Sequence, residues 1–159
     1  MVEMELVGIR VELPENAPIV LLRETSGARR VLQIYIGGPE ATAIAYATEG
    51  VVAPRPLTHD LMKDLLDGLG AQVDKIVVTE LRDHTFHAEI ELSNNGGVTR
   101  VSSRPSDAIA LAVRTGSRIF AEEEVLEAAA MPGDSESAEE LVDEFREFIE
   151  GVSPEDFAS

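Results

Sequence analysis

Alternating hydrophobic and polar positions near the start of the chain predict β-strands. The residues from Val7 to Leu13 alternate in this way, which is typical of a strand with one buried face. A run that is apolar on both faces follows a proline-rich turn, and a Gly-Gly-Pro sequence later opens an alanine-rich helix. In order, the first half predicts strands at 7–13, 19–24 and 30–36, a helix at 40–48, a short strand at 51–53 and a helix at 58–68.

The same order of elements then recurs. The second half predicts strands at 75–81, 85–92 and 98–103, a helix at 105–115, a strand at 118–121 and a helix at 122–130. An offset of 67 positions pairs Glu40 with Asp107 and Thr48 with Thr115, along with alanines between them. We interpret this as an α+β fold in which an internally duplicated β-β-β-α-β-α unit forms one domain over residues 1–131, with repeats at about 5–68 and 75–130. Chance similarity between two alanine-rich helices is the alternative.

The end of the chain has a different pattern. A Pro-Gly pair breaks the chain, and Leu141, Phe145 and Phe148 then follow at helical spacing among acidic residues. The sequence therefore predicts an acidic, amphipathic C-terminal helix over 137–150, within a tail that spans 132–159. We expect its apolar side to dock on the body of the protein or on a partner subunit.

Charge follows the same division of the chain. Residues 1–121 hold 16 acidic and 12 basic side chains, a net charge of −4, whereas residues 122–159 hold 14 acidic side chains and one arginine, a net charge of −13. The polyanionic character thus belongs to the tail, and the body can still present a local cationic face. The tail itself reads as a solvated helix, a partner-binding surface or an internal mimic of an anionic ligand.

Composition narrows the classes of function. The chain has 159 residues, enough for one globular domain, and its lack of cysteine excludes disulfides, thiolate zinc sites and a cysteine nucleophile. It contains no apolar run long enough to span a bilayer and no signal-peptide pattern. We therefore expect a soluble, cytoplasmic protein that has no membrane partner and needs no organic cofactor.

Several short stretches resemble the signatures of a known family. They are RPLTHDL at 55–61, LRD at 81–83 with Phe86, SRPSDAIALA at 103–112, RTG at 114–116 and EEVL at 123–126. Together they are similar to the blocks of the bifunctional nuclease (BFN, DNase/RNase-type) domain family, over about residues 4–130. The resemblance implies an α+β domain, often dimeric, with phosphodiester cleavage as its assigned chemistry, and it supplies no agreed mechanism.

Carboxylates at matched helix starts offer one route to that chemistry. Phosphodiester hydrolysis needs an activated water, stabilisation of the charge on phosphorus and a proton for the leaving oxygen. If the repeat brings the helix starts together, Glu40, Asp60 and Asp107 can supply oxygen ligands for Mg²⁺ or Mn²⁺, and we also count Asp60 and Asp107 as candidate catalytic residues. The alternative is that each acid only complements the dipole of its own helix.

A histidine with nearby arginines offers a second route, without metal. His59 follows Thr58, the expected N-cap of its helix, where the positive helix end favours a neutral imidazole that can act as a catalytic base or a ligand. Arg55 and Arg104 each precede a proline near a helix start and, together with Ser106, are the candidate phosphate-binding residues. The alternatives are an exposed histidine without function and surface arginines paired with neighbouring acids.

Two classes of function remain open. The preferred one is a nuclease with little sequence preference, whose partner is the backbone of DNA or RNA. The arginines expected to contact that backbone are Arg100, Arg104, Arg114 and Arg118, with Arg29 and Arg30 as further candidates. No aromatic residues interleave with them, so we expect no base-stacking platform. The alternative is a non-catalytic dimeric interaction or regulatory module whose acidic tail binds a basic partner.

Edge strands and small-residue helices leave surface to cover, which predicts a homodimer.

Overall fold

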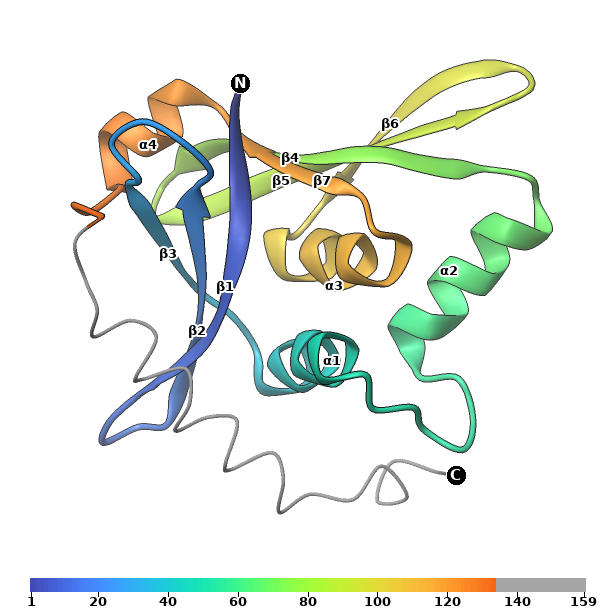
Figure 1. Ribbon diagram of the computed structural model, residues 1–159, viewed down its shortest axis with the longest axis horizontal. Coiled ribbons are helices and arrows are strands. Elements are labelled where there is room, and N and C mark those ends of the chain that lie inside the picture. Colours follow the sequence, from blue (N-terminus) through green and yellow to red (C-terminus); the bar gives the residue numbers. More distant parts are fainter. Residues whose placement is uncertain (134–159) are drawn as a thin grey trace.

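The structure is a computed structural model that describes residues 1–133. Within this range the chain forms a mixed α+β fold with one seven-stranded sheet and four helices (Figure 1). The strands are β1 (Val2–Glu12), β2 (Ala17–Glu24), β3 (Val31–Tyr35), β4 (Gln72–Arg82), β5 (Thr85–Asn94), β6 (Gly97–Ser103) and β7 (Arg118–Ala121). The helices are α1 (Gly38–Glu49), α2 (Thr58–Gly68), α3 (Pro105–Thr115) and α4 (Glu123–Ala129).

The sheet is built from two antiparallel meanders that one short strand joins. The strand order is β3-β2-β1-β7-β4-β5-β6, so β7 lies in the middle although it comes last along the chain. It pairs antiparallel with β1 and parallel with β4. In Figure 1 the β1–β3 meander runs steeply across the direction of β4, β5 and β7, so the sheet curves around the helices.

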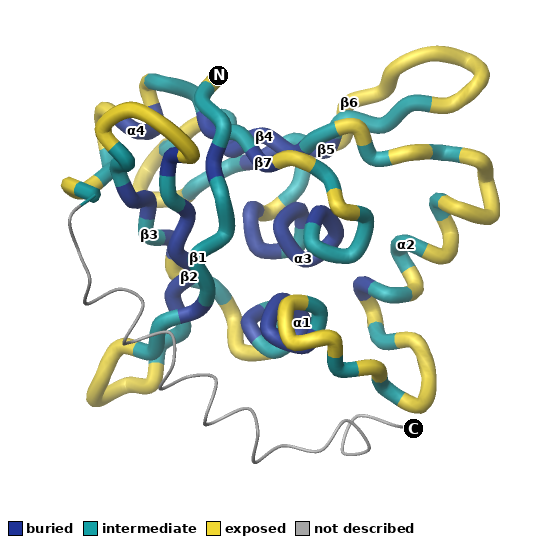
Figure 2. The backbone as a smooth tube through the Cα atoms, in the orientation of Figure 1, coloured by how far each residue is buried: buried dark blue, intermediate teal, exposed yellow. Residues whose placement is uncertain are grey.

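Helices α1 and α3 lie side by side on the inner, concave face of this sheet. Helix α1 packs on β1 and β2, whereas α3 packs on β4, β5 and β7. Leucine, isoleucine and valine from the strands meet alanines from both helices in the main core, and Figure 2 shows this centre as buried. Because alanine is small, the two helices can approach each other closely, which brings their first turns together. Helix α2 packs on α3, and α4 lies at the other end, against β3 and β4.

The two inner helices begin and end alike. Each has an extended N-cap, a proline in its first turn and one acid there, Glu40 in α1 and Asp107 in α3. Each ends at a left-handed glycine, Gly50 with φ 69° and Gly116 with φ 70°, a conformation that costs glycine little. These local matches agree with the offset of 67 positions in the sequence. The internal duplication as a whole stays a prediction.

The strand predicted at 51–53 is wrong, whereas the helix predicted after it, at 58–68, is present as α2. Residues 51–53 have no secondary structure; the Val51 N–H donates to Tyr46 O at the end of α1, and Val52 is 86% exposed. The segment is apolar in sequence but has no neighbouring strand with which to pair. Thr58 is also not the N-cap of its helix, because α2 begins at Thr58 and Leu57 takes the cap position.

The remaining predicted elements of the body are confirmed as to type, with β1 starting earlier than predicted, at Val2. A register shift between Leu6 and Gly8 interrupts the alternation of faces there, which explains why the pattern identified only the later part. The predicted acidic C-terminal helix lies outside the described residues. None of the helices within residues 1–133 is long and apolar enough to cross a lipid bilayer.

Candidate functional site

A histidine and an aspartate form a hydrogen-bonded pair between two helix starts. His59 lies in the first turn of α2 and Asp107 in the first turn of α3. His59 Nε2 is 2.8 Å from Asp107 Oδ1, and only 8% of the His59 side chain is exposed. Because an ionised carboxylate can only accept a hydrogen bond, Nε2 carries the proton in this pair. Nδ1 is then the atom of His59 that can take up a further proton.

Arg104, the N-cap residue of α3, connects this pair to the matched acid of α1. Its Nε donates to Asp107 Oδ2 at 2.8 Å, and its Nη2 donates to Glu40 Oε1 at 2.7 Å. The other oxygen of Glu40 folds back over the start of α1, where a Cβ on Gly37 would overlap it. A glycine at this N-cap therefore leaves room for the carboxylate. The two sequence-matched acids are held by one guanidinium group that lies between them.

Arg114 ties the three helices of the site together. Its side chain is 8% exposed, its Nε donates to Asp60 Oδ1 at 2.7 Å, and its Nη groups donate to the carbonyls of Ala110 and Ala43 at 2.9 and 3.0 Å. The second oxygen of Asp60 accepts the Leu57 N–H at 3.0 Å, at the start of α2. The expectation that Arg114 contacts nucleic acid is wrong, because the side chain is enclosed and its donors are used within the protein. The sequence analysis did not predict that Arg114 joins three helices.

Both aspartates have pKa values below their ordinary value of 3.8. Burial would raise the pKa of Asp107, but hydrogen bonds from Arg104 and His59 outweigh burial and lower it. Burial likewise opposes ionisation of Asp60, whose pKa is lowered by the Arg114 guanidinium and the Leu57 N–H. Asp107 and Glu40 together raise the pKa of Arg104. Asp60, Asp107 and Arg104 are therefore ionised at neutral pH.

These shifts predict stability that is lost in acid. A pKa lower in the folded than in the unfolded state means that the unfolded chain binds more protons as the pH falls. The contribution of Asp60 and Asp107 is thus fully present above pH 3.8 and disappears as the pH drops through the lower, folded-state values. Urea unfolding should show a free energy of unfolding that falls below about pH 4. The Asp60→Asn, Asp107→Asn double variant should show a shallower fall; an identical fall would assign the acid sensitivity to other groups.

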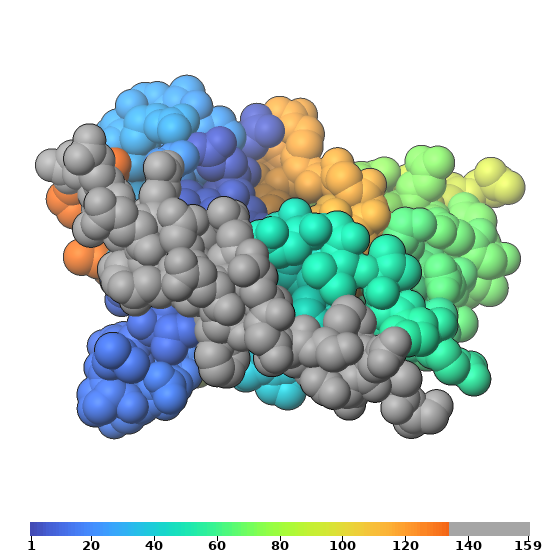
Figure 3. Space-filling view, turned by 60° about the horizontal axis from the view of Figure 1, so that its bottom comes forward, coloured from blue at the N-terminus to red at the C-terminus, as the bar shows by residue number. Residues whose placement is uncertain are grey.

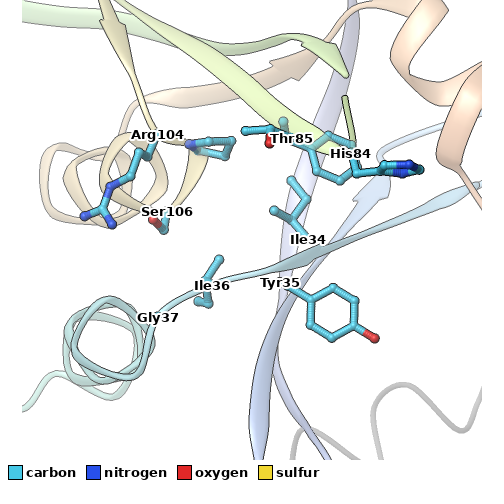
Figure 4. Close-up of a pocket in the computed structure, with 10 residues that line it drawn as sticks. Ile34, Tyr35, Ile36, Gly37, His84, Thr85, Arg104 and Ser106 are labelled. Carbon is cyan, nitrogen blue, oxygen red and sulfur yellow. The ribbon is translucent and has the colours of Figure 1, made fainter. Parts of the chain in front are cut away.

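A pocket of about 370 Å³ opens beside Arg104 (Figure 4). It is lined by the end of β3, the start of α1, the turn between β4 and β5, and the start of α3. Figure 4 shows Arg104 and Ser106 at one end of this pocket and Tyr35 and His84 at the other. Ser106 is only 5% exposed and lies in the first turn of α3, and its role in binding phosphate stays a prediction. The aromatic lining gave no sequence signal, because its residues come from separate strands and turns.

Most of the other arginines expected at a nucleic-acid interface are already paired with carboxylates. The pairs are Arg30 with Glu24 and Glu123, Arg29 with Glu5, Arg100 with Glu91, and Arg118 with Glu3. Arg55 differs from them. It is exposed in the loop before α2, and no ion pair joins it to any residue within 1–133. Arg55, which lies four positions before His59 in the sequence, is therefore available to bind an anion.

The three carboxylates expected to bind metal do not meet as one group. Within the described part of the chain, no three histidine, aspartate or glutamate side chains come together in a way that could hold a metal ion. Glu40 and Asp107 share Arg104, whereas Asp60 faces Arg114. Protein sites for Mg²⁺ often use only one or two carboxylates and complete the shell with water and phosphate. Ligand roles for Glu40, Asp107 and Asp60 all stay predictions.

Comparison with known proteins assigns this chain to a family. The sequence pattern of the bifunctional nuclease domain matches residues 20–134, a range that includes Glu40, His59, Arg104 and Asp107. An uncharacterized protein of Mycobacterium tuberculosis is 45% identical over 98% of this chain and 97% of its own length. Bifunctional nuclease 1 of Arabidopsis thaliana and bifunctional nuclease 2 of Oryza sativa subsp. japonica are 30% and 29% identical over 64% of this chain, which spans 33% of each plant protein. The chain therefore belongs to the bifunctional nuclease domain family.

Proposed function

We propose that this protein is a cytoplasmic nuclease that hydrolyses phosphodiester bonds of DNA or RNA with little sequence preference. The observation that carries the proposal is the position of Asp107, held between His59 and Arg104 where the first turns of α1, α2 and α3 converge. Helix N-termini attract phosphate through their free N–H groups and their positive dipole ends. The names of the plant relatives support the same chemistry at the level of the family.

The proposed roles follow from the contacts. Asp107 holds Nε2 of His59, which leaves Nδ1 to accept a proton from the attacking water or to return one to the leaving oxygen. Arg104 is 63% exposed, so its guanidinium can turn from the two carboxylates toward a phosphate oxygen. Arg55 and Ser106 are the other proposed phosphate-binding residues. The pocket beside Arg104 falls in the lower range of small-molecule sites, so a single nucleotide unit would fit it.

Glu40 and Asp107 are the proposed ligands of Mg²⁺ or Mn²⁺ in this site. Without a cation, two carboxylates beside one arginine would repel a phosphodiester. When bound, such an ion would neutralise the negative charge that develops on the phosphate oxygens. The proposed pairing of these two residues also rests on the internal duplication, which places both in the first turn of matched helices.

A cleavage assay tests the proposed function. Purified wild type should cut single- or double-stranded DNA or RNA, and the Glu40→Ala, Asp107→Ala double variant should lose activity by at least about 100-fold. Asp64→Ala is the matched control, because Asp64 is an exposed acid of α2 outside the cluster. Equal activity in wild type and double variant would mean that a contaminant cuts the substrate. A wild type without activity on all four substrates would overturn the proposal.

Calorimetry tests the metal role separately. Mn²⁺ should raise the melting temperature of the wild type, because an ion that binds only the folded state stabilises it. The Asp107→Asn variant should melt at the same temperature with and without Mn²⁺. If Mn²⁺ raises the melting temperature of both proteins equally, Asp107 serves the protein as a partner of Arg104 and His59 and does not bind the ion.

We also propose that the protein is a homodimer. Leu61 and Leu65 on α2 are 50% and 57% exposed, Leu69 at its C-cap is 78% exposed, and Val98 on the edge strand β6 is 63% exposed. Helix α2 and β6 lie on the same side of the molecule, away from the β1–β3 meander (Figures 1 and 3). Light scattering should give twice the chain mass of 17.2 kDa, and Leu65→Lys should shift the mass toward one chain. A single-chain mass at all protein concentrations would exclude the dimer.

A non-catalytic dimeric module is the second candidate function. The pairing of most arginines with carboxylates favours it, since a nucleic-acid interface needs cations that are free to meet phosphate. The cleavage assay and the light-scattering measurement together separate the candidates. A stable dimer that cleaves none of the substrates would favour the module.

A further inference from the structure

The outer face of the sheet, opposite α1 and α3, carries a small apolar cluster. Val7, Ile19, Leu21 and Val31 form this cluster, which we call the outer patch, and it is separate from the main core. Ile19 and Leu21 are both 0% exposed. Within residues 1–133, however, the outer patch consists only of side chains from β1, β2 and β3. Apolar side chains on the outside of a sheet are buried only when another layer covers them.

Arginines surround the outer patch. Arg10 lies directly opposite Ile19, and Arg23 directly opposite Val31, so both share the face of the patch. Arg29 lies beside Arg23, since Glu5 Oε1 accepts from Arg23 Nε at 3.0 Å and from Arg29 Nη2 at 3.1 Å. Three guanidinium groups thus share two carboxylates, Glu5 and Glu12, the latter 3.9 Å from Arg10. Arg10, Arg23 and Arg29 therefore supply cations along the rim of the patch.

The described chain ends at the edge of the same patch. Met131 exchanges two backbone hydrogen bonds with Val31, at 2.8 and 2.9 Å, and so continues the sheet beyond β3. Gly133 packs against the backbone of Arg29 so closely that a Cβ there would overlap Arg29 O. The position of residue 133 is therefore fixed beside the arginine rim. Any cover supplied by the following residues starts from there.

We propose that residues 137–150 of the same chain pack on the outer patch as an amphipathic helix. This segment holds Leu141, Phe145 and Phe148 at helical spacing, which matches an apolar patch. It also carries six acidic side chains and one arginine, a net charge of −5, which complements the arginines of the rim. The covered face is the opposite face from the site of His59 and Asp107, so the acidic charges of the segment are held away from the proposed substrate.

The reach of the chain favours the patch of the same subunit. Only residues 134–136 separate Gly133 from the start of the segment, and an extended chain of this length spans at most about 14 Å. A helix of this length is about 21 Å long, enough to cross three strands that are spaced about 4.8 Å apart. The segment therefore begins within reach of β3 and has the length to cover β2 and β1.

Cysteine cross-linking tests this placement, and the absence of native cysteine leaves no background thiol. Full-length protein with Gln33→Cys and Ala138→Cys should react with a short bismaleimide within one chain, because Gln33 lies opposite Leu21 and Ala138 lies three positions before Leu141. The control protein carries Asp64→Cys on α2 together with Ala138→Cys. We expect the first pair to cross-link at least about ten times faster than the control pair.

Substitutions in the segment complete the test without altering the body. Phe145→Glu with Phe148→Glu should slow the Gln33–Ala138 cross-link by at least about tenfold, because the glutamates replace the apolar side chains that would be buried on the patch. Phe145→Leu with Phe148→Leu should retain most of the rate, since the helix keeps its apolar side. Equal rates for the two cysteine pairs, or a rate unchanged by the glutamates, would overturn the proposal. A product that joins two chains only would also overturn it and assign the cover to a second copy.

Discussion

Replacing His59 by glutamine should lower the turnover number for phosphodiester cleavage by about 10²- to 10⁴-fold. The glutamine amide can still donate a hydrogen bond to Asp107, as His59 Nε2 does at 2.8 Å, but it cannot take up a proton. The expected loss is therefore in kcat, with KM nearly unchanged. Initial rates over a range of substrate concentrations measure both quantities, in the presence of the metal ion that gives the wild type its highest activity.

The control for this substitution is His87→Gln on β5, a histidine outside the cluster. It should retain wild-type kcat. A normal kcat in His59→Gln would remove His59 from the catalytic step and leave a metal-only mechanism. A loss of kcat accompanied by a lower melting temperature in His59→Gln would instead point to a structural role for the pair.

Replacing Glu24 by glutamine should destabilise the protein by about 2–3 kcal/mol at neutral pH. Only 6% of the Glu24 side chain is exposed, and its oxygens accept the Arg30 N–H at 2.7 Å, Nε at 3.1 Å and Nη2 at 2.7 Å. These hydrogen bonds lower the pKa of Glu24, so the pair is ionised at the pH of the measurement. Arg30 also donates to Glu123 on α4 at 3.1 Å, a pair that the substitution leaves in place.

Urea unfolding measures this loss, with Glu3→Gln as the control. Glu3 forms the same type of pair, with Arg118 at 2.7 Å, but on the surface, where water and salt screen the interaction. The control should therefore lose much less stability than Glu24→Gln. Equal losses would mean that burial of the Glu24 carboxylate is not what makes its ion pair strong.

Most helices and strands of the fold could be predicted from short stretches of the sequence, whereas their arrangement in space could not. Alternation and turn residues identify strands, and glycine after a run of alanines marks the end of a helix at Gly50 and at Gly116. Alternation shows which face of a strand is buried but says nothing of which strand lies beside it. The central place of β7 could not be read from the sequence for this reason. The apolar residues at 51–53 led to a wrong strand prediction for the same reason, since a strand forms only where a neighbouring strand can pair with it.

The sequence allowed the residues of the candidate site to be named, but it did not allow the hydrogen bonds between them to be predicted. Glu40 and Asp107 stand at matched positions of two similar helices, and both are in fact bound to Arg104. The His59–Asp107 hydrogen bond joins residues 48 positions apart, and only the packing of α2 on α3 brings them together. Arg114 resembled a surface residue because nothing in its neighbourhood in the sequence indicates that three helices enclose its side chain.

The central position of β7 also determines when the sheet can be completed during synthesis. Val2, Glu3 and Met4 of β1 pair with Ala121, Phe120 and Ile119 of β7, so β1 is synthesised well before the strand with which it pairs. Until then the edges of β1 and β4 that face each other in the finished sheet have no strand between them. Such long-range pairing slows folding, because a long loop must close before the contact forms. A nascent chain that ends before Arg118 therefore holds two meanders without the strand that joins them.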